Sequence, residues 1–216
     1  MSLTGTFGVF GALGQAGVNK ALTTLFTVRP HYLHYASPPF VSASSPAVTA
    51  MSAIPFPGVP GGIPWAVDFT VPHVDLFPAD GALPPPLGLG PNQFAVATAA
   101  TITVGCLRDD PKDDRHRTVT PVRTTLDVVA VGHPSARYFS PGVGDVSLVV
   151  DQVAVEKVEP PSLDGLLECL VRTLLNGALS QVRLPFDLID GGFFKLVLQS
   201  GPAVADDRLE VWGGVA

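Results

Sequence analysis

The chain has 216 residues, a formal net charge of −6 and a mean hydropathy of +0.35, with 46% apolar and 15% charged residues. A typical globular chain is about 25% charged, so an unusual share of apolar side chains must be buried in a core, at an interface or around a ligand. With only 13 lysine and arginine residues, the chain lacks the cationic stripe on which nucleic-acid affinity depends. We therefore expect no nucleic-acid partner and no charge-driven docking on anionic membranes.

The length fits a single domain over residues 1–216. The 22 glycines and 22 prolines favour many turns and short strands over a helix bundle. No apolar run approaches the roughly 20 residues of a membrane-spanning helix, so we expect no transmembrane segment. The N-terminal sequence lacks the cationic and apolar regions of a signal peptide. We therefore expect a cytoplasmic protein, with secretion by a leaderless route as the alternative.

The first 30 residues predict a strand or extended lead-in, residues 4–13, and then a short helix that Pro30 ends. The apolar residues that recur there at helical steps of three and four are Val18, Leu22, Leu25 and Phe26. The next 30 residues are rich in Pro, Ser and Gly, and predict one strand followed by irregular edge structure.

Apolar and polar residues alternate in the middle of the chain, which predicts long antiparallel strands. Such strands are expected over residues 65–71, 94–104 and 122–128. The only dense charge cluster, residues 108–117, lies between two of them and is interpreted as a solvated hairpin tip. A calcium site at its four aspartates is the alternative, but the spacing and distal glutamate of a calcium loop are lacking.

The last predicted strands are residues 146–158, 193–201 and 208–215. Within the first of them the alternation changes phase after Val150 and resumes at Val153, as a bulge or bend would require. Asp206 and Asp207 are expected in the turn between the last two strands.

Residues 162–182 predict a long amphipathic helix with Ser162 as its N-cap. Its apolar face holds about five positions per two turns, more than an ordinary surface helix needs. We therefore expect an α+β fold in which a long, curved antiparallel sheet wraps around this helix, with a shorter helix near the N-terminus. One alternative is a solid core plugged by the helix, and the other is an apolar tube with helix and sheet as walls.

Three stretches resemble the tubular lipid-binding (TULIP) superfamily, and most closely its members encoded beside bacterial neurotoxins and the bactericidal permeability-increasing proteins. They are "VFGALGQAGVNKALTTLF", "IPWAVDFTVPHVDLFP" and "GPAVADDRLEVWGGV". The resemblance implies a TULIP-like domain over the whole chain that binds phospholipid or a fatty-acyl ligand, or a scaffold role in an assembly. It implies no catalytic residues. In the secreted branch a disulfide ties a strand to the long helix, where Cys106 and Cys169 stand here, whereas the compartment argument favours reduced thiols.

Enzyme motifs are lacking: the chain has no nucleophile elbow, P-loop or zinc-protease motif. His73 is expected on the side of its strand that faces the core. His133 precedes Pro134 in a predicted turn, where a pair with Ser135 has no identifiable orienting acid, and Asp151 is expected to face solvent. We therefore expect neither catalysis, nor a metal, nor a cofactor.

The leading hypothesis is binding or transfer of a lipid or other apolar ligand in a tube between helix and sheet. The rival hypothesis is a structural or interaction subunit, a homo- or hetero-oligomer that uses the same apolar surface as an interface. The predicted apolar lining consists of Leu22, Leu25, Phe26, Phe69, Phe94, Val96, Ile102, Leu126, Leu148, Leu166, Leu170 and Leu174.

Overall fold

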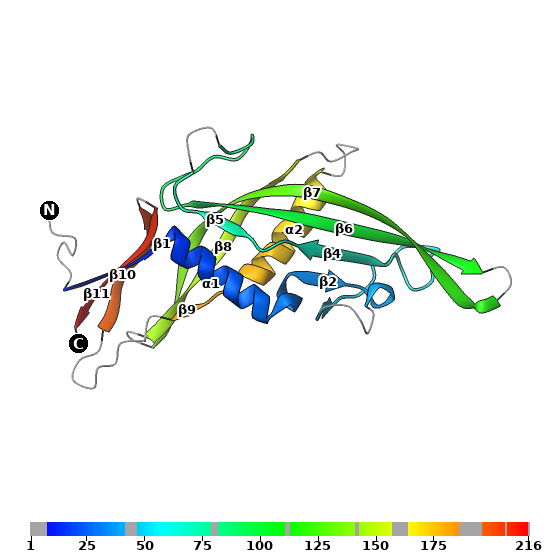
Figure 1. The fold of residues 1–216 in the computed structure, drawn as a ribbon, viewed down its shortest axis with the longest axis horizontal. Helices are drawn as coiled ribbons and strands as arrows, with labels where there is room; N and C mark the ends of the chain where they lie inside the picture. The colour runs from blue at the N-terminus through cyan, green and yellow to red at the C-terminus, as the bar shows by residue number, and fades with distance from the viewer. Residues whose placement is uncertain are drawn as a thin grey trace.

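The computed structural model describes residues 8–41, 47–78, 82–110, 113–140, 143–156, 164–185, 196–205 and 207–215; within them the side chains of 106–110, 113–119, 140, 143, 196–198 and 215 are not described. The fold is α+β and mostly sheet: a strongly curled, half-barrel sheet carries two helices, and a small sheet lies at one end (Figure 1). The predicted α+β class and curved sheet are therefore confirmed. None of the helices in this part of the chain is both long and apolar enough to span a bilayer.

The main sheet has the strand order β3-β2-β4-β6-β7-β8-β9, with β5 paired to β6, and the small sheet has the order β1-β11-β10. All described pairings are antiparallel except that between β2 and β3. The bounds are β1 Val9–Gly14, β2 His34–Ala36, β3 Thr49–Ala50, β4 Trp65–Phe69, β5 His73–Asp75, β6 Phe94–Asp110, β7 Asp113–Ser140, β8 Val143–Val155, β9 Leu184–Pro185, β10 Leu196–Ala205 and β11 Arg208–Val215. Two short 3-10 helices, Pro30–Tyr32 and Pro38–Phe40, flank β2.

Strand β7 runs without a break through two prolines, so the turn predicted at His133–Pro134 is wrong. Proline lacks an N–H and is tolerated where a strand has a free side. β7 pairs with β8 alone at Pro134, because β6 begins at Phe94, opposite Gly132. It pairs with β6 alone at Pro121, because its pairing with β8 ends at Val128. Each proline therefore lies where β7 has one neighbour.

The predicted change of phase in β8 is confirmed as a β-bulge. Val131 is opposite Gln152 while the next residue, Gly132, is opposite Val150, so Asp151 is the extra residue. Glycine is required at position 132, because a Cβ there would overlap the carbonyl of Val149 and press on the Phe94 ring. The bulge keeps Val150 and Val153 on the same, buried face of the sheet.

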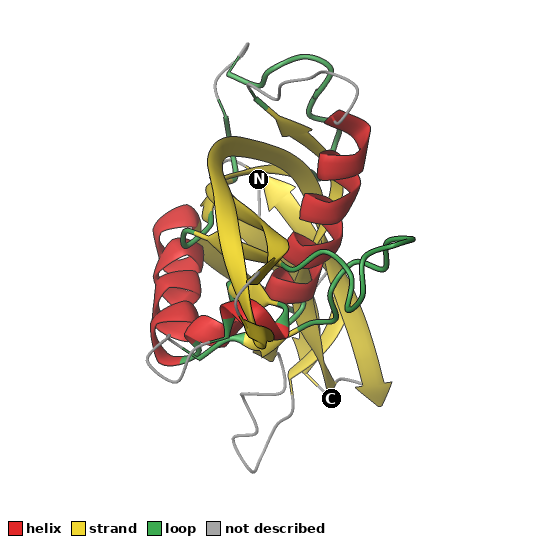
Figure 2. Ribbon diagram, turned by 90° about the vertical axis from the view of Figure 1, so that its right-hand side faces the viewer, coloured by secondary structure: helices red, strands yellow, loops and turns green. Residues whose placement is uncertain are grey.

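The two helices are nearly equal in length: α1 spans Gln15–Val28 (14 residues) and α2 spans Asp164–Leu179 (16 residues). α1 confirms the predicted N-terminal helix. α2 ends before the predicted terminus, although Val182 beyond it is still buried; the expected N-cap, Ser162, lies outside the described residues. Figure 2 shows the two helices on either side of the curled sheet.

An asparagine in each helix binds an edge strand of the half-barrel. The Asn19 side chain of α1 accepts from Val74 N (2.8 Å) and donates to Val74 O (2.7 Å) on β5. Asn176 of α2 does the same to Val150 on β8, at 2.8 and 2.9 Å. An unpaired strand edge exposes backbone donors and acceptors, and the amide of asparagine offers one of each. Each helix thus satisfies the backbone of one residue on a free strand edge, Val74 on β5 and Val150 on β8.

Candidate ligand-binding site

The predicted lining residues lie mainly in the hydrophobic core between the helices and the concave face of the sheet. Leu25 and Leu170 pack at the border of this core, and Leu166 lies outside it with 68% of its surface exposed. The nine that are buried in the core are Leu22, Phe26, Phe69, Phe94, Val96, Ile102, Leu126, Leu148 and Leu174.

The centre of this core is closed by its own side chains. A side chain on the wall of an open tube keeps accessible surface toward the tube, but Leu22 and Phe94 are 0% exposed and Val96 is 1% exposed. Close packing of this kind is typical of protein interiors. The site for a ligand must therefore be sought where the core meets the surface.

An apolar groove of about 210 Å³ lies where the small sheet meets the main sheet. Its lining residues are Gly11, Ala12, Leu13, Val146, Leu184, Pro185, Leu209 and Val211, contributed by β1, β8, β9 and β11. None of them is charged. Val146 and Leu209 belong to the hydrophobic core, and Leu13 and Leu184 pack against it, so the floor of the groove is continuous with the core.

Strand register places the apolar side chains of the groove together. β1 pairs with β11 so that Leu13 is opposite Leu209 and Gly11 is opposite Val211. These residues share one face because side chains two apart in a strand point the same way. On the facing wall, β8 pairs with β9 through Val146 and Leu184. Two ion pairs flank the groove, Asp145–Arg183 at 3.7 Å and Arg208–Glu210 at 2.7 Å.

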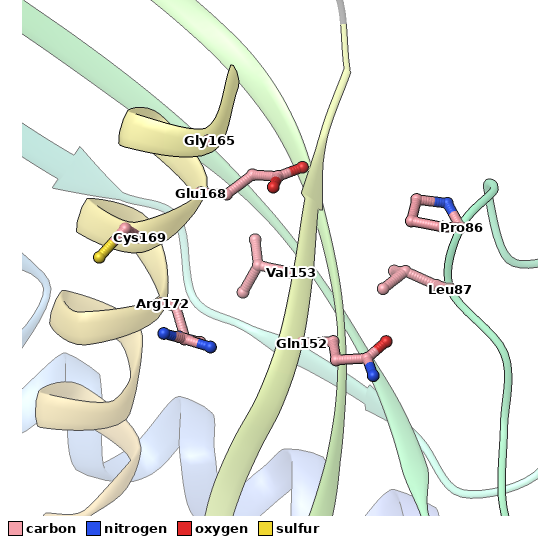
Figure 3. A pocket seen from close by; sticks show the side chains of 8 residues that line it. All are labelled: Pro86, Leu87, Gln152, Val153, Gly165, Glu168, Cys169 and Arg172. Atoms are coloured by element: carbon pink, nitrogen blue, oxygen red, sulfur yellow. The ribbon is translucent and has the colours of Figure 1, made fainter. Parts of the chain in front are cut away.

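A second pocket, of about 290 Å³, lies between α2, the free edge of β8 and the loop before β6. Its walls are mixed: Pro86, Leu87 and Val153 are apolar, whereas Glu168 and Arg172 are charged. Figure 3 shows the Glu168 carboxylate pointing toward β8 and the Cys169 sulfur pointing away from it. A pocket with charged walls suits an acyl chain less well than the apolar groove does.

Cys169 is a free, exposed thiol. The side chain of Cys106 is not described, and neither are the side chains of the charge cluster 108–117. Because Cys169 is free, the disulfide that the resemblance implies is not formed in this structure. The calcium alternative involves undescribed side chains and stays a prediction.

His133 has an orienting acid, contrary to expectation. Its Nδ1 lies 2.9 Å from both carboxylate oxygens of Asp151, the bulge residue, and Gln93 donates to the same carboxylate at 3.2 Å. The sequence missed this pair because the bulge, which brings Asp151 beside His133, determines it. Among the described residues Ser135 makes no hydrogen bond to His133, so the nucleophile, base and acid of a hydrolase are not assembled there.

Two other histidines, His73 and His34, differ in their surroundings. His73, expected in the interior, is exposed at the start of β5. His34 on β2 lies opposite Asp68 on β4, and its Nδ1 is 2.8 Å from the carboxylate. Both histidine–aspartate pairs join neighbouring strands, a structural role that needs no substrate.

Comparison with protein-family models, curated proteins and solved structures gives no match to this chain. The resemblance to the tubular lipid-binding superfamily thus stays a prediction.

The residues of the groove were not predicted as lining. The expected lining came from the two helices and the long strands, and it left out β1 and the closing strands. Leu209 and Val211 alternate with polar Glu210 in the sequence, which was the available signal. What the sequence did not indicate is that β1 pairs with β11 in a separate sheet.

Proposed function

We propose that the chain binds a lipid or another apolar ligand without catalysing a reaction, and that the acyl part of the ligand lies in the groove between the two sheets. The observation that carries the proposal is the groove itself, with uncharged walls from four strands and a floor continuous with the core. Burying apolar ligand surface there contributes about 25 cal/mol per Å².

A TULIP-like fold and a cytoplasmic location belong to the same proposal. The curled sheet and the two helices along its edges are the features that support such a fold. A ligand larger than the groove requires the two sheets to separate. The acyl chain of the ligand can then enter the closed core. Ligand pockets in proteins typically measure about 300–1,000 Å³, so we expect the groove to widen when it is occupied.

Native mass spectrometry of the purified protein tests the proposal. We expect a ligand adduct on the wild type and on Val211→Ile, which keeps the groove apolar. Val211→Trp, which fills the groove from β11, a strand position that accepts an aromatic residue, should lose the adduct while its circular dichroism stays that of the wild type. An adduct-free wild type, or an adduct retained by a folded Val211→Trp protein, contradicts the proposal.

A structural or interaction subunit is the second candidate function, and the closed centre of the core is the observation that favours it. In that case the apolar surplus in the composition seals contacts between subunits. A purified protein that is free of ligand and forms a stable homo- or hetero-oligomer would support this function over the first.

A further inference from the structure

A proline- and glycine-rich segment, residues 51–63, projects from the sheet before β4; we call it the tongue. Figure 1 draws it in light blue to cyan beside β2 and β4. Its two ends are joined by a β-bridge, in which Ile54 N donates to Ile63 O (2.9 Å) and Ile63 N donates to Ile54 O (2.8 Å). The tongue is therefore a closed loop with a defined shape.

The backbone conformation of the tongue depends on glycines at positions where other residues would be strained. Three glycines adopt positive φ, at positions 58, 61 and 62, a region that other residues rarely occupy. At Gly62 a Cβ would also overlap the carbonyl of Ile54. Trp65 at the start of β4 donates from Nε1 to Ser52 O at 2.9 Å, which ties the tongue to the sheet.

The tongue exposes apolar side chains that the fold leaves uncovered. Met51 is 38% exposed, Ile54 48% and Phe56 55%. Exposed apolar residues that are grouped on an ordered loop mark an interaction surface, whereas single scattered ones are normal.

The tongue also lies within a segment without charge. No Asp, Glu, Lys, Arg or His occurs from residue 35 to residue 67. Another long uncharged stretch, residues 81–107, comprises the loop before β6, which is largely exposed where it is described, and most of β6, whose apolar side chains are largely buried up to Ile102. The tongue combines the lack of charge with three exposed large apolar side chains, whereas the described part of the loop before β6 exposes one, Leu89 at 40%.

Two exposed valines extend this surface along the concave face of the sheet. Val104 on β6 is opposite Trp65, and Val122 on β7 is opposite Val104. They are 39% and 68% exposed, although the residues before Val104 on the same face, Ala100 and Ile102, are buried. The charge cluster farther along the hairpin, residues 108–117, contains four Lys or Arg and four Asp, so its formal charge is zero.

We propose that the tongue, with Val104 and Val122 beside it, docks on the surface of a zwitterionic phospholipid bilayer. The lack of charged residues on this surface favours a neutral bilayer as its partner. A surface without cations, on a chain of net charge −6, has no attraction for anionic lipid, and it loses no charge solvation when its side chains enter the apolar boundary of a neutral bilayer. This docking goes beyond ligand binding in the groove and does not rest on it.

Flotation with phosphatidylcholine vesicles tests the proposal. The wild type should float with them. Phe56→Ser and Ile54→Ser should each lower the partition coefficient roughly three- to tenfold, because each removes a half-exposed apolar side chain from the contact. Phe77→Ser is the matched control, since Phe77 is 69% exposed on the segment after β5 and outside this surface. Raising the salt from about 0.1 M to about 0.5 M should leave binding unchanged.

Three results would overturn the proposal: no flotation of the wild type, binding that requires anionic lipid, or equal losses for Phe56→Ser and Phe77→Ser. Light scattering adds a fourth, because a dimer that Phe56→Ser dissociates, with no vesicle binding, would make this surface an interface between two copies. Val211→Trp should float like the wild type. Flotation without a ligand adduct would therefore contradict ligand binding in the groove but support docking of the tongue on the bilayer.

Discussion

The two helices bind strand edges in the same way, through similar local sequences. α1 contains Val18-Asn19-Lys20-Ala21-Leu22, and α2 contains Leu175-Asn176-Gly177-Ala178-Leu179. In both, the asparagine binds one edge strand, while the residue before it and the residue three positions after it are at most 2% exposed.

The helices differ in what surrounds the asparagine. On α1 a second side chain helps, because Leu76 N donates to Gln15 Oε1 at 2.8 Å on the same short segment. On α2 the corresponding contact is weak, because the exposed Arg172 donates to Asp151 O at a long distance of 3.5 Å. The comparison teaches that a polar residue in the middle of an apolar helix face can cap a sheet edge, and that α2 depends on this cap more than α1 does.

The largest effects should come from the equivalent leucines. Leu22→Ala and Leu179→Ala should each lower the free energy of unfolding by about 3–5 kcal/mol, because both side chains are fully buried and neither site can collapse easily. Urea titration measures both. A cost below about 1 kcal/mol for either one would show that the two helices are not equivalent in the core.

The asparagines should come next and should differ. Asn176→Ala leaves the N–H and C=O of Val150 without their partner and should cost about 2–4 kcal/mol, and Asn19→Ala should cost about 1–3 kcal/mol because Gln15 still holds the segment. Ser180→Ala is the control, because Ser180 is exposed in the turn just after α2; the expected change is within about 0.5 kcal/mol. The reverse order of the two asparagine variants in urea titration would refute the role given to Gln15.

Tyr35 gives α2 a pH dependence that α1 lacks. Its hydroxyl donates to Leu174 O at 3.2 Å, and burial raises its pKa to about 12 from 10.0. In the unfolded chain tyrosine loses its proton near pH 10, so the unfolded state gains stability between pH 10 and 12 while the folded state does not. The free energy of unfolding should therefore be unaffected by this group below pH 10 and fall by about 2 kcal/mol up to pH 12.

Tyr35→Phe separates this effect from other alkaline changes. It should cost about 1 kcal/mol at neutral pH, through the lost hydrogen bond, and it should remove that part of the fall between pH 10 and 12. An identical alkaline slope in wild type and variant would show that Tyr35 is not buried as described.

The smallest effect separates two leucines of α2 that the sequence treats alike. Leu166→Ser should change the free energy of unfolding by no more than about 0.5 kcal/mol, because Leu166 is exposed. Leu170→Ser, at the border of the core, should cost clearly more. Equal costs in urea titration would place Leu166 in the core, as the lining prediction has it.

Periodicity predicted the parts of this fold that depend on neighbours in sequence. α1, the strands at 65–69 and 94–104 and the bulge after Val150 follow from the spacing of apolar residues, because burial on one face determines that spacing. The course of β7 through Pro121 and Pro134 did not follow, since a proline is acceptable only where a neighbouring strand is missing, and single-strand patterns do not show neighbours.

The candidate site was less predictable than the fold. Of the predicted lining, Phe94 and Leu22 are buried as expected but in a closed centre, and no predicted residue lines the groove. The groove depends on β1 pairing with β11 across almost the whole chain and on β9 meeting Val146. Such long-range pairings leave no periodic signal.

Photocrosslinking with a fatty acid that carries a diazirine at its terminal carbon tests the central claim most directly. Peptide mapping of the labelled protein should place the label on β1, β8, β9 or β11, at residues such as Leu13, Val146, Leu184 and Leu209 that line the groove, and excess unlabelled fatty acid should suppress it. Label confined to the second pocket or to the tongue, or label that unlabelled fatty acid does not compete away, would contradict the account.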